Sequence, residues 1–248
     1  MFAAFYVDHS LITMGMLDLF SASFANVVKI VVANNPDVLF ALMPYIQSGW
    51  IVIKGSNLHH EFSAWQEGLA YYLLHLDVVA DYFVFVNDTI ARPNGHLHAA
   101  HLNKLRALMS RKRSGCALGL VHSSPLNNLS MSISGYNASP WISSGLFALD
   151  CEIIKLLKFK VDYVDNVAHL VKKNTSGRSL FTEAIDPHLE NHILSWLFDG
   201  YAGGWNQLRG SVDSTVDSKI IRNKALMILA EKFLSIRLRQ VNAQILSL

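Results

Sequence analysis

Short apolar runs alternate with longer segments of helical spacing through the first 90 residues, and this alternation limits the folds open to the chain. Strands are predicted at residues 2–7, 29–34, 50–55 and 82–86. Helices are predicted between them, at residues 14–28, 36–47 and 62–79. This order predicts an α/β protein with a mostly parallel sheet, right-handed crossovers and helices on both faces.

The rest of the chain is less regular. Further strands are predicted at residues 116–121 and 141–150, and further helices at residues 97–113, 151–158 and 186–200. The polar residues 123–141 are expected to cover the sheet edge, and residues 217–248 to form one terminal helix. We therefore predict a Rossmann-like domain at residues 1–210 and a C-terminal helical extension at residues 211–248, packed on that domain or on a partner.

Composition narrows the class of protein. Hydrophobic residues make up 51% of the chain and charged residues 16%, which indicates thorough burial or an apolar interface. The net charge is only +2, so nucleic acid is not an expected partner. Two cysteines without a CxxC pair indicate neither a disulfide framework nor a zinc knuckle. With no recognisable secretory signal and no apolar run of about 20 residues, the prediction is a cytoplasmic protein.

Polar side chains follow each of the four predicted strands. The candidates for binding a nucleotide are Asp8, Asn34, Asn57, Asn87 and Asp88. In an open α/β sheet, ligands bind beyond the carboxyl ends of the strands, so these residues predict a ligand site. The alternative is that Asn and Asp are common where a strand passes into a loop.

Three blocks of the chain form a recognisable set, "NLHHEFSAWQEGLAYYLLHLDVVADYFVFVNDTIARP", "WISSGLFALD" and "LENHILSWLFDGY". They resemble segments of glycosyltransferases that build bacterial polysaccharides and some viral glycans. Together they cover about a quarter of the chain, in the order found in those enzymes. The resemblance implies a GT-A architecture, a nucleotide diphosphate sugar as donor and, in many such enzymes, Mn²⁺ or Mg²⁺.

The resemblance assigns the metal and diphosphate site to the end of the fourth strand. Asp88 matches a carboxylate of the short acidic element, and a carboxylate is a suitable ligand for a hard cation. Asn87 and Thr89 replace the acids of the two-carboxylate form, which weakens the expected metal site. His192 is a candidate for a further metal ligand. In the alternative interpretation, Asp88 accepts hydrogen bonds from loop amides.

The remaining candidates concern the acceptor. A base must deprotonate the acceptor hydroxyl in an inverting transfer. Glu190 of the third block is the first candidate, and Asp186, four residues earlier on the same predicted helix face, is the second. An ordinary exposed acidic helix face is the alternative. Trp141, Ser143 and Ser144 open the second block and are candidates for acceptor binding, whereas a buried packing role is the alternative for Trp141.

The sequence thus predicts a glycosyltransferase, inverting in the first interpretation, that acts on a glycan, lipid-linked saccharide or glycoprotein. A noncatalytic nucleotide- or glycan-binding module remains an alternative. A sugar-phosphate nucleotidyltransferase is disfavoured because "DHSLITMGM" lacks the basic, Gly-rich loop that such enzymes carry after their first strand.

Positive charge is concentrated at the C-terminal end. Residues 219–248 contain six Lys or Arg residues against Glu231 alone, a net +5, which leaves −3 for the rest of the chain. The apolar residues of this segment spread around the helix, so it must be covered on several sides. The open possibilities are a homodimer, a peripheral membrane contact that would suit a lipid-linked acceptor, and burial within the chain.

Overall fold

The structure is a computed structural model that describes residues 1–5, 10–88, 99–111, 113–123, 131–173, 180–199 and 218–248. The chain forms two compact units. The sheet unit comprises Met1–Val121, Ile142–Asp162 and Arg237–Leu248, and the second unit comprises His122–Trp141 and Tyr163–Ile236. The predicted domain boundary between residues 210 and 211 lies outside the described residues.

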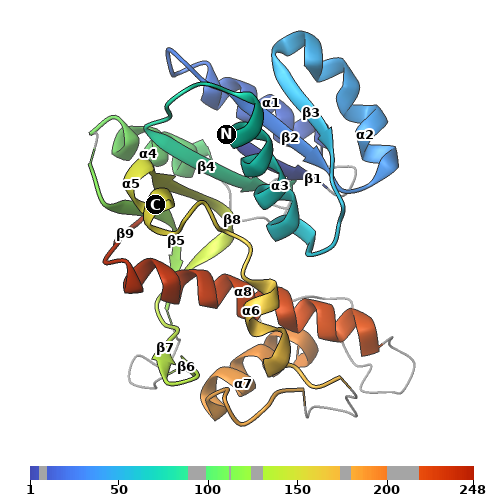
Figure 1. The fold of residues 1–248 in the computed structure, drawn as a ribbon, viewed down its shortest axis with the longest axis vertical. Coiled ribbons are helices and arrows are strands. Elements are labelled where there is room, and N and C mark those ends of the chain that lie inside the picture. The colour runs from blue at the N-terminus through green and yellow to red at the C-terminus, as the bar shows by residue number, and fades with distance from the viewer. Residues whose placement is uncertain (6–9, 89–98, 112, 124–130, 174–179, 200–217) are drawn as a thin grey trace. The chain divides into compact units, whose positions relative to one another are not determined.

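A seven-stranded sheet in the order β3-β2-β1-β4-β8-β5-β9 forms the centre of the sheet unit (Figure 1). Its strands are β1 (Phe2–Phe5), β2 (Lys29–Ala33), β3 (Trp50–Lys54), β4 (Tyr82–Asn87), β5 (Cys116–His122), β8 (Trp141–Asp150) and β9 (Gln244–Ser247). The first four strands pair in parallel, β2 with β3 and β1 with both β2 and β4. The predicted α/β fold with a mostly parallel sheet is confirmed.

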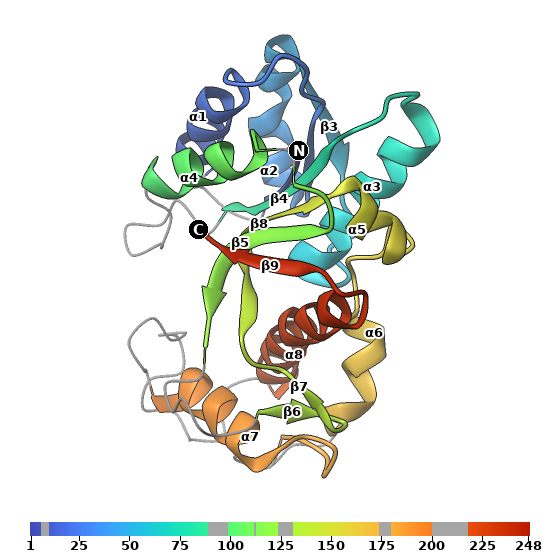
Figure 2. The same ribbon diagram turned by 90° about the vertical axis from the view of Figure 1, so that its left-hand side faces the viewer.

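Helices cover both faces of this sheet, as the alternation predicts (Figure 2). One face carries α1 (Ser10–Ser21), α2 (Pro36–Leu42) and α4 (Ala99–Met109). The other carries α3 (His60–His75) and α5 (Cys151–Leu156). Successive strand residues point to opposite faces, so each strand contributes to two apolar layers.

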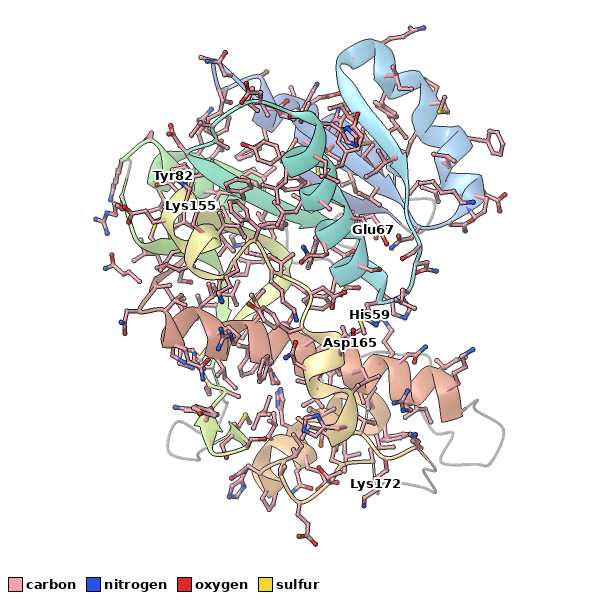
Figure 3. The ribbon with its side chains drawn as sticks, viewed as in Figure 1. His59, Glu67, Tyr82, Lys155, Asp165 and Lys172 are labelled. Carbon is pink, nitrogen blue, oxygen red and sulfur yellow. The ribbon has the colours of Figure 1, made fainter. Side chains whose placement is uncertain are left out.

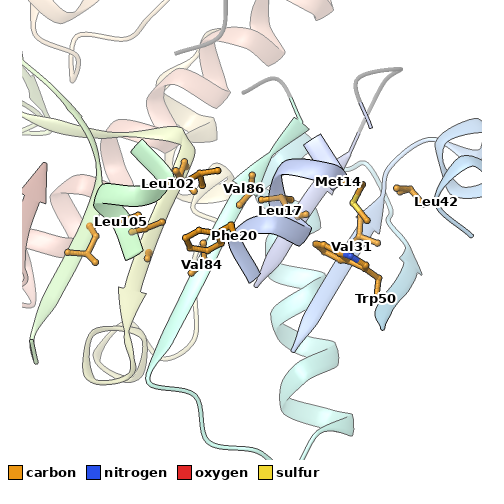
Figure 4. Packing of buried hydrophobic residues seen from close by; sticks show 14 of the residues in the cluster. Met14, Leu17, Phe20, Val31, Leu42, Trp50, Val84, Val86, Leu102 and Leu105 are labelled. Carbon is orange, nitrogen blue, oxygen red and sulfur yellow. The ribbon is translucent and has the colours of Figure 1, made fainter. Parts of the chain in front are cut away.

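The core divides between these two faces. On the first face, Met14, Leu17 and Phe20 of α1 pack with Val31 and Val86 of the sheet (Figure 4). On the second face the packing is aromatic, because the Phe85 ring stacks between those of Phe2 and Phe147 at 5.2 Å and 4.8 Å. Trp65 of α3 packs edge-on against Phe147, with ring centroids 5.3 Å apart. Trp65 is a core residue, since its side chain is fully buried.

The second predicted helix is shorter than expected. It ends at Leu42 and continues as a 3₁₀ helix, η1 (Met43–Ser48). Pro44 contributes to the change, because proline has no backbone N–H to donate to the carbonyl four residues earlier, and the Met43 N–H donates to the Phe40 carbonyl three residues back. Gly49 then takes a left-handed φ of 78° and turns the chain into β3.

The predicted terminal helix also ends early, so the expectation of one helix to residue 248 is wrong. α8 (Ser218–Gln240) stops where Asn242 adopts a φ of 58° and the Ala243 N–H donates to the carbonyl of Leu238. This left-handed cap frees the last residues to extend. They form β9, which pairs in parallel with β5.

Most side chains in the middle of α8 are buried, which satisfies the apolar pattern that extends around this helix. Lys232, one of the six basic residues of this C-terminal segment, is only 1% exposed. Among the residues that the structure describes, no helix combines the length and the apolar character that crossing a membrane requires.

The second unit also contains short elements that the sequence did not reveal. They are β6 (Ser132–Ile133), β7 (Tyr136–Asn137), α6 (Val164–Val167) and the 3₁₀ helix η3 (Ala168–Leu170). The helix predicted at residues 186–200 is present as α7 (Pro187–Leu194), followed by a π turn, η4 (Ser195–Asp199). Gly200, its predicted end, lies outside the described residues.

Candidate functional site

The strand order of the sheet unit reverses beside β1. From β1 the chain moves outward through β2 to β3, and β4 then returns to the opposite side of β1. In open α/β sheets this reversal separates the loops that follow the two central strands, and ligands bind outside their carboxyl ends. The carboxyl edge of β1 and β4 is therefore the candidate site.

Two predicted residues, Asn87 and Asp88, stand at this edge. Asn87 is the last residue of β4 and is 6% exposed, and Asp88 follows it and is 1% exposed. Thr13 of α1 donates its hydroxyl to the backbone carbonyl of Asp88 at 3.3 Å, which ties the end of β4 to the helix that follows β1. A carboxylate is thus held in a fixed position at the reversal point.

Asn34 lies at the corresponding end of β2 and is 6% exposed. Its Nδ2 donates to the carbonyl of His60 at 2.9 Å, and its Oδ1 is buried with no hydrogen-bond partner among the described residues. Gly55 packs directly against this amide, because a Cβ at Gly55 would lie 2.1 Å from Asn34 Oδ1. Only glycine fits at this approach of two strand ends.

The loop after β3 holds Asn57, another predicted nucleotide residue. Asn57 is exposed and has a left-handed φ of 55°. The preceding Ser56 is fixed by Glu67 of α3, whose Oε2 accepts from the Ser56 N–H at 3.0 Å (Figure 3). Asp8, the candidate after β1, lies outside the described residues.

Strand β8 brings two predicted acceptor residues to the same edge of the sheet. β8 runs antiparallel to β4, and the pairing ends with Val86 opposite Leu146. The residues that precede Leu146, including Ser143 and Ser144, therefore lie at the edge where β4 ends in Asp88. Ser143 Oγ accepts from the Gly145 N–H at 3.2 Å. The donor and acceptor candidates of the sheet unit are thus neighbours.

The predicted bases belong to the second unit. Asp186 caps α7, where its Oδ1 accepts from the His188 N–H at 2.8 Å. Glu190 lies in the first turn of α7 and is half-buried. These positions give Asp186 a structural role and leave Glu190 as the carboxylate candidate on this helix.

Trp141 and His192 meet in a cluster of the second unit. The Trp141 ring is 7% exposed, and its centroid lies 5.4 Å from that of His192 and 6.0 Å from that of His122. Lys232 Nζ lies 3.2 Å from the indole centroid. These side chains pack against the Trp141 indole, which the sequence assigned to acceptor binding.

Burial shifts the ionisation of this cluster. It lowers the pKa of Lys232 to about 7, although the neighbouring Glu231 carboxylate acts in the opposite direction. It also lowers the pKa of His192 to about 4, and the charge of Lys232 adds to that effect. An ammonium beside His192 repels cations, which makes this histidine a poor metal ligand. Within the described ranges, no group of three or more His, Cys, Asp or Glu side chains is arranged to hold a metal ion.

The sequence interpretation did not single out His59 and Asp162. His59 Nδ1 lies 2.7 Å from Asp162 Oδ2 in the sheet unit, although the residues are 103 positions apart in the chain. No spacing rule connects residues so distant. The only local signal was the position of His59 in the loop after a parallel strand, where ligand-binding residues gather.

No protein-family model matches the chain, and a search of curated proteins finds no significant match.

Proposed function

We propose that the chain is a GT-A-type glycosyltransferase that transfers a sugar from a nucleotide diphosphate donor to a glycan, lipid-linked saccharide or glycoprotein. The observation that carries this proposal is the placement of Asp88, a buried carboxylate at the carboxyl end of β4 beside the strand reversal. The mostly parallel sheet with helices on both faces is compatible with the Rossmann-like core that such an enzyme requires.

The strand-end residues divide into two groups in this proposal. Asn34 and Asn57 are proposed to contact the base or ribose of the donor, and Asn87 and Asp88 its diphosphate. Ser143 and Ser144 approach the same edge from β8 and are proposed to contact the acceptor. Side-chain amides and hydroxyls both donate and accept hydrogen bonds, which suits sugar hydroxyls and nucleobase edges.

A divalent cation fits the oxygen donors at the end of β4. Asp88, with Asn87 beside it, would supply oxygen ligands for Mg²⁺ or Mn²⁺, and diphosphate and water oxygens would complete the shell. A bound cation would neutralise charge on the departing diphosphate. Because one carboxylate is a weak anchor, we expect the metal to bind appreciably only together with the nucleotide.

A screen of nucleotide diphosphates and their sugars by thermal shift, with and without Mn²⁺, tests the proposal. At a ligand concentration of 100 times Kd, binding should stabilise the folded protein by about 2.7 kcal/mol. Release of nucleotide diphosphate in the presence of acceptor then separates an enzyme from the alternative, a noncatalytic binding module. A protein that no nucleotide stabilises would refute both the enzyme and a nucleotide-binding module.

Glu190→Gln tests the carboxylate that the sequence assigns as base. If Glu190 takes the acceptor proton, the variant should bind donor normally and lose transfer by a factor of about 100 or more. Glu183→Gln is a matched control, because Glu183 is an exposed carboxylate of the same unit. Equal transfer by both variants would exclude Glu190 as the base.

A further inference from the structure

The contact between His59 and Asp162 determines which nitrogen of the His59 ring carries the proton. Their side chains are 15% and 14% exposed, so the pair is largely shielded from water. An ionised carboxylate only accepts hydrogen bonds, so the proton of the 2.7 Å contact belongs to Nδ1 of His59. In the neutral ring, Nε2 then carries the lone pair and can accept a proton.

Helix α3 holds the aspartate side of the pair. Gln66 Oε1 accepts from the backbone N–H of Val161 at 2.9 Å and from that of Asp162 at 3.4 Å. Gln66 Nε2 donates to the carbonyl of Phe159 at 2.9 Å. One amide side chain therefore clamps the segment that carries Asp162 to the helix that follows His59.

The histidine side is held equally closely. Ser63 Oγ accepts from the His59 N–H at 3.0 Å and donates to the carbonyl of His60 at 3.0 Å. The same His60 carbonyl accepts from Asn34, a proposed nucleotide contact at the end of β2. His60 takes a left-handed φ of 51°, a conformation that costs energy in a non-glycine residue and that often marks functional sites.

The start of α3 lies at the carboxyl edge of the sheet. Figure 3 marks His59 at the beginning of this helix. Trp65 Nε1 donates at 2.9 Å to the carbonyl of Val86, two residues before Asp88. At about 1.5 Å of rise per residue, the start of α3 lies about 7 Å from Trp65 along the helix axis, and His59 immediately precedes it. The imidazole thus belongs to the same edge as the proposed diphosphate site.

On the basis of the glycosyltransferase function proposed above, we propose that His59 is the general base of the transfer and that Asp162 is its positioning residue. His59 Nε2 takes the proton of the acceptor hydroxyl while the hydroxyl oxygen forms a bond to the anomeric carbon. The bond from that carbon to the donor phosphate oxygen breaks, and its electron pair leaves with the nucleotide diphosphate. Asp162 stabilises the resulting imidazolium, which later returns its proton to solvent.

This assignment differs from the carboxylate that the sequence resemblance implies. Glu190 belongs to the second unit, whereas His59, Asp162 and Asp88 all belong to the sheet unit. The base and the leaving-group site are therefore built on one compact scaffold. A neutral imidazole held by a carboxylate is a common general base in enzymes.

The test combines donor titration and transfer rates for His59→Gln, Asp162→Asn and a matched control, His75→Gln. His75 lies at the other end of α3, where it contacts Tyr71. We expect His59→Gln to lower kcat by a factor of about 100 or more while the donor Kd changes by less than about twofold. Asp162→Asn should lower kcat by about tenfold or more through misorientation of the ring, and His75→Gln should leave it unchanged.

A chemical rescue separates catalysis from a structural role. Imidazole added to His59→Ala should restore part of the lost kcat, since the small base can occupy the vacated space, and should not affect His75→Ala. Wild-type kcat in a folded His59→Gln or Asp162→Asn variant, or loss of transfer in Glu190→Gln alone, would overturn the inference and leave the proposed function intact. Absence of donor binding in the wild-type protein would instead overturn the proposed function.

Discussion

Lys232 Nζ lies 3.2 Å from the centre of the Trp141 indole ring, and both side chains are more than nine-tenths buried. The indole face attracts the ammonium and offsets part of its desolvation. Burial still lowers the pKa of Lys232 to about 7 from the ordinary value of 10.5. Folding therefore disfavours the charged form of this amine.

The stability of the second unit should rise with pH between about 7 and 10.5. In that window the unfolded chain binds a proton at Lys232 that the folded chain has lost, so raising the pH favours the fold. Below pH 7 the burial of charged Lys232 lowers the free energy of unfolding by its full amount. Above pH 10.5 the amine is neutral in both states, and this effect is absent. Urea unfolding should show a slope of about 1 kcal/mol per pH unit for this single group.

Lys232→Met should remove that slope and raise the unfolding free energy at pH 7, because the apolar side chain fills similar space without a charge. Lys219→Met, at the exposed first turn of the same helix, is the control and should retain the wild-type slope. A Lys232→Met protein with the wild-type pH dependence would show that the amine is not responsible.

Asp150 joins the end of β8 to α5 and to β5. Its Oδ1 accepts from the Ile153 N–H at 2.8 Å as the helix cap, and its Oδ2 accepts from the Cys116 N–H. Asp150→Ala should cost about 2–4 kcal/mol of unfolding free energy, since it removes a cap and leaves a buried N–H unsatisfied.

Asn35→Ala is the comparison for Asp150, because Asn35 caps α2 through a single bond to the Asp37 N–H. Its expected cost is about 1 kcal/mol in the same urea experiment. Equal losses in the two variants would mean that the bond from Asp150 to β5 contributes nothing to stability.

Gly55→Ala should both destabilise the sheet unit and weaken donor binding. The added methyl group would lie 2.1 Å from Asn34 Oδ1 and 2.9 Å from Val32 Cγ1, so one strand end must move, at a cost of about 1–3 kcal/mol. Gly15→Ala is the control, since nothing lies within 4 Å of its added methyl group and helix propensity favours alanine. Wild-type stability and affinity in Gly55→Ala would refute this account of Asn34.

The sequence was most informative where burial and periodicity agree. The strands β1 to β4 are short apolar runs between helices, and their parallel order follows from that alternation. The placement of Ser143 beside the edge that holds Asp88 depends on the antiparallel register of β8, which no local pattern encodes. The pairing of β9 with β5 was missed because its short apolar run continues the helical spacing of α8.

Long-range contacts between polar residues were the least predictable feature. His59 and Asp162 meet where Gln66 holds the segment after α5 against α3. In the sequence, Lys232 is one of six basic residues near the C-terminal end, and nothing distinguishes it from the others. In the structure it is buried against the ring of Trp141. Both contacts are products of tertiary packing, and the charge pattern along the chain does not indicate them.

Isothermal titration of a nucleotide diphosphate sugar, identified by the thermal-shift screen, into Asp88→Asn and Asp81→Asn tests the central claim most directly. The two aspartates flank β4, the buried Asp88 at its carboxyl end and the exposed Asp81 at its other end, so the two variants compare the two edges of the sheet. We expect Asp88→Asn to raise the donor Kd by about tenfold or more, a loss of about 1.4 kcal/mol, and Asp81→Asn to match the wild type. Unchanged binding in Asp88→Asn, or an equal loss in both variants, would contradict a donor site at the carboxyl edge of β4.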